Sequence, residues 1–304
     1  MDLIHPQLAA FATVLEEGSF EAAGRRLSLT ASALSQRVKA LEDRLGQVLL
    51  VRQTPCLPTP AGEKLLLRLQ PMKVLQAEAL ADLNAERTSS LLPLAVTVAV
   101  DRDSLQSWVM NALATLHQQH GYIFDIRVGD ADGTLAMLRE GTVLGAVTSQ
   151  ARPLKGCNVL SLGTLRYRPI ASPTFAQRYF PEGIDARGLA RAPMLIFNRR
   201  DELPWMFLRQ ITRARISPPA HHLPACTDIL DAVRSGLGWS IAPVAQVDAA
   251  LADRSLVALD PVRTLAVPLY WQHSAVRSST LQIISRTFAE AAHRANGAGS
   301  PEPA

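Results

Sequence analysis

The chain has 304 residues, a length that favours two domains or one large one and excludes a mini-protein held together by disulfides or metal ions. Apolar residues make up 48% and charged residues 19%, values near those of globular proteins, which excludes a mostly disordered or fibrous chain. The net charge of +4 is too weak to indicate a nucleic-acid partner unless the basic residues are concentrated in one segment.

The compartment follows from what the sequence lacks. Its first residues carry no basic and apolar signal segment, and the longest strongly apolar stretch, residues 91–100, is half of the ~20 residues that a spanning helix requires. The three cysteines, Cys56, Cys157 and Cys226, have neither a disulfide-framework spacing nor a zinc-type spacing. We therefore expect a cytoplasmic protein without a membrane partner.

Composition divides the chain into four zones. Residues 1–58 are dense in short helical patterns, and residues 59–90 form one leucine-rich pattern that predicts a long linker helix. Residues 91–295 alternate short β-rich runs with helical stretches. Residues 296–304 are rich in Gly, Ser and Pro, which predicts a disordered tail.

Within the first zone, two short helices are predicted on either side of a tight turn. The first is capped by Ser19 and ends near Ser28, and the second begins after Thr30, a good N-cap residue. An apolar stripe that must face a core is formed by Leu34, Val38, Leu41 and Leu45. This arrangement is typical of a helix-turn-helix whose second helix enters the major groove, with a plain helical hairpin as the alternative.

The polar face of the second helix has the chemistry of base and phosphate recognition. Small serines allow close approach, Gln36 can bond adenine, and Lys39 can reach guanine or a phosphate. Residues 25–52 contain six basic and two acidic side chains, a local excess that equals the net charge of the whole chain. The candidate DNA-binding residues are Ser32, Ser35, Gln36, Lys39, Arg25, Arg26, Arg37 and Arg52.

In the third zone, strand-like runs alternate with helical patterns, which predicts parallel sheets flanked by helices, with ligands at the carboxyl ends of the strands. The predicted strands are Leu94–Val100, Ile123–Val128, Val143–Thr148, Tyr167–Ala171, Met194–Phe197, Trp239–Ala242 and Val267–Trp271.

A specific resemblance is carried by Phe20-x-x-Ala23, then Ser35-Gln36-Arg37-Val38-Lys39-x-Leu41-Glu42-x-x-x-Gly46-x-x-Leu49-Leu50-Val51-Arg52, and Thr59-Pro60-Ala61-Gly62. This string resembles the N-terminal domain of LysR-type transcriptional regulators. The resemblance implies an all-α winged helix-turn-helix, a long linker helix, and an α/β two-lobed periplasmic-binding-protein-like effector domain. Lobe I would span about 91–164 and 266–295, and lobe II about 165–265.

Further motifs are similar to the ArgP/LysG branch of that family, whose members respond to lysine and arginine and control basic amino-acid export. They are Val98-Ala99-Val100-Asp101-x-Asp103-Ser104-Leu105-x-x-Trp108, Leu138-Arg139-x-Gly141-x-x-x-Gly145-Ala146-Val147, and Leu269-Tyr270-Trp271-Gln272. Two departures stand out. Ala31 replaces a Gln that many members carry, and Pro71 is expected to kink the linker helix.

The linker helix has apolar residues at alternating spacings of four and three, typical of a short coiled-coil seam: Leu65, Leu69, Met72, Ala79 and Leu83, with the polar Gln76 among them. We therefore expect a homodimer, which places two recognition helices on a two-fold operator. The alternative is a helix lying against its own effector domain. The resemblance also implies homotetramers and contact with RNA polymerase.

A basic amino acid as effector would need hydroxyls and helix amides for its carboxylate and carboxylates for its cationic groups. Such side chains follow the predicted strand ends, and the effector is expected between the two lobes. The candidates are Asp103, Ser104, Trp108, Asp130, Asp132, Thr148, Ser149, Thr227 and Asp228. The plainer interpretation of each Asp, Ser or Thr is a helix cap.

Three other functions are weighed against this one. An α/β enzyme fused to a DNA-binding module is disfavoured because the sequence lacks a nucleophile elbow, a Walker loop and a zinc-protease motif; no catalytic, metal or cofactor site is predicted. A LysR-type regulator with a different effector, and an origin-binding inhibitor of chromosome initiation, share the same DNA-binding chemistry. The operator and the direction of regulation are left open.

Overall fold

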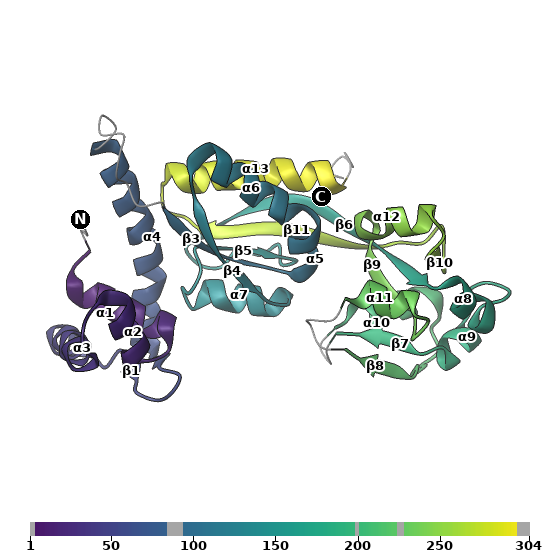
Figure 1. Cartoon of the computed structure of the whole chain (residues 1–304), viewed down its shortest axis with the longest axis horizontal. Coiled ribbons are helices and arrows are strands. Elements are labelled where there is room, and N and C mark those ends of the chain that lie inside the picture. Colours follow the sequence, from purple (N-terminus) through teal and green to yellow (C-terminus); the bar gives the residue numbers. More distant parts are fainter. Residues whose placement is uncertain (1–3, 84–93, 198–200, 224–227, 297–304) are drawn as a thin grey trace. The chain divides into compact units, whose positions relative to one another are not determined.

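The computed structural model describes residues 4–83, 94–197, 201–223 and 228–296 (Figure 1). The chain forms two compact units, which we call unit 1 and unit 2. Unit 1 comprises Met1–Leu162 and Leu269–Ala292, and unit 2 comprises Gly163–Pro268 and His293–Ala304. Among the described residues, no helix is both long and apolar enough to cross a membrane, and no cluster of His, Cys, Asp or Glu could hold a metal ion.

The N-terminal part of unit 1 is helical, with a small two-stranded wing. The predicted caps are confirmed: the Ser19 hydroxyl accepts from the Ala22 amide at 3.1 Å, and the Thr30 hydroxyl accepts from the Ala33 amide at 3.1 Å. The wing strands pair antiparallel. The elements are α1 (Pro6–Glu17), α2 (Phe20–Leu27), α3 (Ala31–Leu45), β1 (Leu50–Val51), β2 (Leu57–Pro58) and α4 (Pro60–Leu83).

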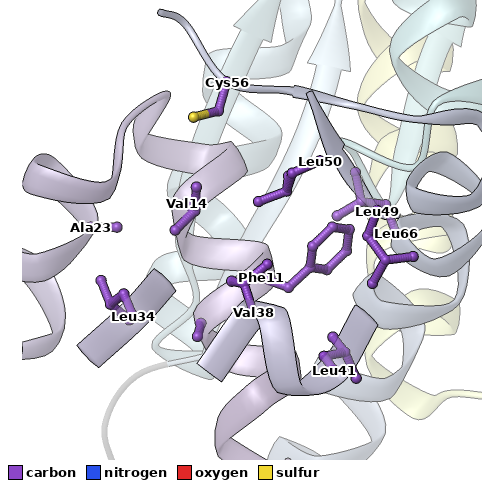
Figure 2. Close-up of a cluster of buried hydrophobic side chains, with 11 residues drawn as sticks. Phe11, Val14, Ala23, Leu34, Val38, Leu41, Leu49, Leu50, Cys56 and Leu66 are labelled. Carbon is purple, nitrogen blue, oxygen red and sulfur yellow. The ribbon is translucent and has the colours of Figure 1, made fainter. Parts of the chain in front are cut away.

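One apolar cluster joins these helices to the wing and to α4 (Figure 2). Three of the four predicted stripe residues lie in it. The fourth, Leu45, is a correction: it is 48% exposed because it is the last residue of α3, where the helix has already passed beyond the core. The labelled members in Figure 2 are Phe11, Val14, Ala23, Leu34, Val38, Leu41, Leu49, Leu50, Cys56 and Leu66.

The linker helix α4 begins where Thr59 caps it, the Thr59 hydroxyl accepting from the Gly62 amide at 3.1 Å. It continues as one helix through Pro71. One side of α4 is buried in its own unit at Leu66, Leu69 and Val74. Met72, Leu75 and Leu83 are exposed, so α4 has a second, unburied apolar side.

The rest of unit 1 is an α/β layer in which β3, β4 and β5 are parallel and β11 runs antiparallel to β5. The sheet is therefore mixed, which corrects the prediction of parallel sheets. In Figure 1, α6 and α13 cover one face of this sheet and α7 covers the other. The elements are β3 (Ala95–Val100), α5 (Arg102–Ser104), η1 (Leu105–Val109), α6 (Met110–His120), β4 (Ile123–Val128), α7 (Ala131–Arg139), β5 (Gly145–Thr148), β11 (Leu265–Ser274) and α13 (Ser279–Asn296).

Unit 2 is entered through β6 (Cys157–Ala171) and left through β11, so each of these long strands contributes residues to both units. Within unit 2, β9 and β10 run antiparallel to β6, and β7 pairs with β8 in parallel. Its further elements are α8 (Pro173–Tyr179), α9 (Ala186–Arg191), β7 (Met194–Ile196), α10 (Leu203–Ile211), β8 (Ala220–His222), α11 (Ile229–Arg234), β9 (Ser240–Pro243), α12 (Val244–Ala252) and β10 (Val257–Ala258).

Candidate DNA interface and effector site

The candidate DNA interface is the polar face of α3. Ser32, Gln36 and Lys39 are exposed, and Ser35 is half-buried beside the wing. Because α3 is held by its apolar stripe on the opposite side, these four side chains present hydrogen-bonding groups outward at helical spacing. Such a face can bond base edges and phosphates.

The basic residues around α3 fall into two groups. Arg25 and Lys39 are exposed and Arg37 is half-exposed; within the described part of the chain, none of the three forms an ion pair. Arg26 and Arg52, in contrast, are each ion-paired with glutamates of the same chain, although both side chains are about half exposed. The charge available to a duplex therefore differs from residue to residue within the basic segment.

Arg26 lies in a network that joins three helices. Its guanidinium is 2.8 Å from a Glu17 oxygen and 3.1 Å from a Glu16 oxygen, and Lys73 of α4 is 2.6 Å from the other Glu16 oxygen. The hydrogen bond to Glu17 raises the pKa of the Arg26 guanidinium above its ordinary value. These pairs hold α2, α1 and α4 together, and they offset the charge of Arg26.

Arg52 follows the wing strand β1 and turns back onto α3. Its guanidinium donates to the Ser35 hydroxyl at 2.9 Å, approaches a Glu42 oxygen at 3.6 Å, and lies 5.4 Å from the centre of the Phe20 ring. Arg52 therefore contacts the candidate DNA face through Ser35, and its own side chain lies beside that face.

The candidate effector site is the carboxyl edge of the parallel strands of unit 1. Val100 lies opposite Val128 in the ladder of β3 and β4, and Ala99 lies opposite Ala146 in the ladder of β3 and β5. The residues just beyond these strands therefore lie along one edge of the sheet, the edge at which open α/β folds bind their ligands.

The segment after β3 contains buried polar atoms that lack a partner. Asp101 caps α5, its Oδ1 accepting from the Ser104 amide at 2.8 Å, but its Oδ2 is buried with no hydrogen bond from any described residue. The hydroxyl of Ser104 and the indole N–H of Trp108 are likewise buried and unpartnered within the described chain. Two donors and one carboxylate oxygen in this segment therefore have no hydrogen-bond partner among the described residues.

Burial also changes the acidity of this carboxylate. It raises the pKa of Asp101 above its ordinary value, opposed by the nearby side chain of Ser104 and by the hydrogen bond from the Ser104 amide. A cation bound at Oδ2 would favour the ionised form and reverse this shift. Asp101 was absent from the candidates named from the sequence, although its position three residues before Ser104, directly after a strand, is the signal of a helix N-cap.

The other candidates near this edge are more exposed or already bonded. Asp130 is exposed and caps α7 through the Gly133 amide at 2.7 Å, and Asp132 is exposed in the first turn of α7. Thr148 is buried and accepts from the Gln150 amide at 3.2 Å. Asp103 and Ser149 are half-buried.

The remaining two candidates belong to unit 2. Asp228 is exposed and caps α11, accepting from the Leu230 amide at 2.9 Å. Thr227 lies outside the described residues.

Comparison with known families identifies both the N-terminal helical part and the α/β part of the chain. Residues 5–63 match the family of bacterial regulatory helix-turn-helix proteins of the lysR type, and residues 94–293 match the LysR substrate binding domain. The chain belongs to the LysR family. Members of the LysR family are transcriptional regulators, so the chain is a DNA-binding regulator with an effector-binding domain and not an enzyme.

Similar LysR proteins place it within a branch. The chain is 41% identical to the HTH-type transcriptional regulator LysG of Mycobacterium tuberculosis over 94% of its own length and 93% of that protein. It resembles the crystal structure of ArgP from Mycobacterium tuberculosis with a TM-score of 0.81 and 41% identity, covering 96% of this chain and 98% of that one.

A third similar protein is full-length LysG from Corynebacterium glutamicum with bound effector Arg, with a TM-score of 0.71 and 34% identity over 96% of this chain and 99% of that one. These relationships place the chain in the ArgP/LysG branch of the LysR family, as its motifs indicated.

Proposed function

We propose that this regulator responds to a basic amino acid, L-arginine or L-lysine, and controls genes of basic amino-acid export or metabolism. The observation that carries the proposal is the set of unpartnered buried atoms after β3: Asp101 Oδ2, Ser104 Oγ and Trp108 Nε1. An α-amino acid is complementary to them, because its carboxylate accepts from a hydroxyl or an indole N–H and its ammonium pairs with a carboxylate.

The basic side chain of the effector requires a further carboxylate. Asp103, Asp130 and Asp132 lie after the neighbouring strand ends of unit 1 and are proposed for this role, with Thr148 and Ser149 as additional hydroxyls. Asp228 and Thr227 of unit 2 remain proposed effector residues on the basis of the sequence. The bound arginine in the related LysG of Corynebacterium glutamicum supports this class of effector.

The proposal includes a homodimer on double-stranded DNA. The exposed apolar side of α4, with Met72, Leu75, Ala79 and Leu83, supports dimerisation through the linker helix. Leu69 is buried in its own chain and Leu65 is half-buried, so their contribution to a partner would be smaller. The same proposal includes assembly into homotetramers and contact with RNA polymerase. It also includes the division of the chain into a DNA-binding domain (1–58), a linker helix (59–90) and an effector domain (91–295).

In mechanism, the effector would shift the equilibrium between two states of the dimer that differ in how their recognition helices fit the operator. A ligand can shift such an equilibrium only as far as its affinities for the two states differ.

The test is calorimetric titration of the purified protein with L-arginine, L-lysine, and the uncharged analogues L-citrulline and L-norleucine. We expect heat release and a raised melting temperature with at least one basic amino acid and neither effect with its uncharged analogue. If all four ligands were inert, or if the uncharged analogues bound equally well, the effector would be of another class.

A further inference from the structure

Arg52 is fixed from both sides by the winged helix-turn-helix. One nitrogen of its guanidinium donates to Ser35 Oγ at 2.9 Å, and another lies 3.6 Å from Glu42 Oε2. The carbon between them lies over the ring of Phe20, 5.4 Å from its centre. A planar fork of donors can make these three contacts together.

Glu42 in turn ties the wing to α3. Its side chain is only 11% exposed, and its Oε1 accepts from the amide of Leu49 at 2.8 Å and from the amide of Leu50 at 3.3 Å. The other oxygen faces Arg52. The position of Arg52 relative to α3 is therefore set by a nearly buried carboxylate that also fixes the start of β1.

We propose that Arg52 acts on DNA through Ser35, as a positioning residue that makes the Ser35 hydroxyl a hydrogen-bond donor to the duplex. This inference rests on the proposed role of Ser35 in DNA binding. Because the Ser35 oxygen already accepts from a cation, its O–H is left to donate, and the nearby positive charge strengthens that donor.

The same charge disfavours a second donor approaching Ser35, such as the exocyclic amino group of cytosine or adenine. Ser35 is therefore directed to acceptors: a phosphate oxygen, or a base-edge atom such as guanine N7 and O6 or thymine O4. Arg52 itself is offset by Glu42, so its own contribution to counterion release is small compared with that of the unpaired Arg25.

The experiment measures DNA affinity of the full chain for Ser35→Ala, Arg52→Lys and the double variant, with Arg25→Ala as a matched surface control. The probes are the duplex that the wild-type protein selects from a randomised pool and a pool of random duplexes of the same length. Each affinity is measured at several salt concentrations, and melting temperatures test folding. Arg52→Lys keeps the charge opposite Glu42 while removing the fork.

We expect Ser35→Ala and Arg52→Lys each to weaken binding of the selected duplex about tenfold, the size of one charge-assisted hydrogen bond. In the Ser35→Ala background, Arg52→Lys should change affinity less than about twofold, because the two residues act as a unit. Neither should alter the slope of log affinity against log salt, whereas Arg25→Ala should make this negative slope shallower by about 0.9. A merely structural role of Arg52 would lower affinity equally in both backgrounds.

The two probes identify the acceptor. Equal losses on the selected and random duplexes identify a phosphate oxygen, and a loss confined to the selected duplex identifies a base edge. The inference is overturned if Arg52→Lys binds like the wild type, or if its loss is the same with and without the Ser35 hydroxyl. A wild-type chain that selects no duplex would overturn the proposed function instead. Binding of arginine and lysine by Arg52→Lys distinguishes the two failures, because the inference concerns only the DNA face and predicts unchanged effector binding.

Discussion

The carboxylate of Glu78, on the linker helix, accepts a hydrogen bond from the backbone amide of Thr280 at 2.7 Å, across 202 positions of the chain. The same oxygen accepts from the hydroxyl of Ser278 at 2.6 Å and from that of Ser279 at 3.1 Å. Thr280 lies in the first turn of α13, whose free amides and dipole favour a negative charge. Glu78 therefore joins α4 to the helix that covers one face of the unit 1 sheet.

Replacing this carboxylate should destabilise unit 1. We expect Glu78→Ala to lower the free energy of unfolding by about 1–2 kcal/mol, the cost of a lost N-cap with charge-assisted bonds. Burial acts to raise the pKa of Glu78, but the hydrogen bonds from Ser278, Thr280 and Ser279 outweigh it and lower that pKa. The stabilisation is thus present above the ordinary glutamate pKa and lost as pH falls through the lowered one.

Denaturant unfolding at neutral pH and at acid pH measures this effect, with the exposed Asp82→Ala of α4 as control. A Glu78→Ala variant as stable as the control at neutral pH would contradict the prediction.

Salt dependence should separate the two groups of arginines. Arg25→Ala should reduce the magnitude of the negative slope of log affinity against log salt by about 0.9 if it removes one phosphate contact. Arg26→Ala should leave the slope nearly unchanged, because its charge is already offset by Glu16 and Glu17. Binding isotherms of the selected duplex between low and moderate salt provide the measurement, and equal slopes for both variants would show that the ion pairs do not matter on DNA.

Effector binding should depend on pH through Asp101. Its pKa is raised by burial, so the folded protein holds this proton more tightly than the unfolded chain does. Stability therefore decreases as pH rises from the ordinary aspartate pKa through the raised one. A cationic effector needs the ionised form, so its affinity should increase over the same window and level off above it. Asp101→Asn should bind basic amino acids at least about tenfold more weakly and remove the pH dependence. Calorimetry across this pH range tests both, and a pH-independent wild-type affinity would refute the assignment.

The packing around β5 leaves no room for a side chain at Gly145. A Cβ at this position would overlap the indole ring of Trp271, which is fully buried and held by its N–H bond to the Ser285 hydroxyl at 3.0 Å. We expect Gly145→Ala to lower the free energy of unfolding by about 1–3 kcal/mol through overpacking. Gly121→Ala is a useful comparison, since nothing lies near its Cβ but its φ of +68° is strained for alanine. Thermal melting should rank Gly145→Ala as the less stable variant. The reverse order would contradict the prediction and show that the Trp271 ring moves aside.

Dimerisation should depend on the exposed side of α4. Met72 is 43% and Leu83 79% exposed in the single chain, so glutamate at both positions should not disturb the fold of the unit. It should shift the protein toward monomers at micromolar concentration, because an apolar seam would gain like charges from both chains. Sedimentation velocity measures the mass, and an unchanged assembly would place the dimer contact elsewhere.

Local patterns in the sequence were sufficient for the N-terminal fold. The Ser19 and Thr30 caps, and the spacing of Leu34, Val38 and Leu41, are set within one helix, and the structure agrees with all of them. Each predicted strand run overlaps an observed strand for the same reason, but β8, β10 and residues 157–166 of β6 were not predicted. The mixed direction of the sheet was not predicted either, because β11 pairs with β5 more than a hundred residues away.

Sequence alone determined the family, the helix-turn-helix with its basic segment, and the polar residues that follow the strand ends, because each depends on residues near one another in the chain. Only the tertiary structure decided which of those residues are already paired with other groups of the protein. The pairing of Arg26 with Glu17, the turn of Arg52 onto Ser35, and the unpartnered Asp101 Oδ2 depend on where separate elements meet. Spacing along one element fixes the face a side chain occupies, whereas its charge and hydrogen-bonding capacity depend on the neighbours that packing brings to it.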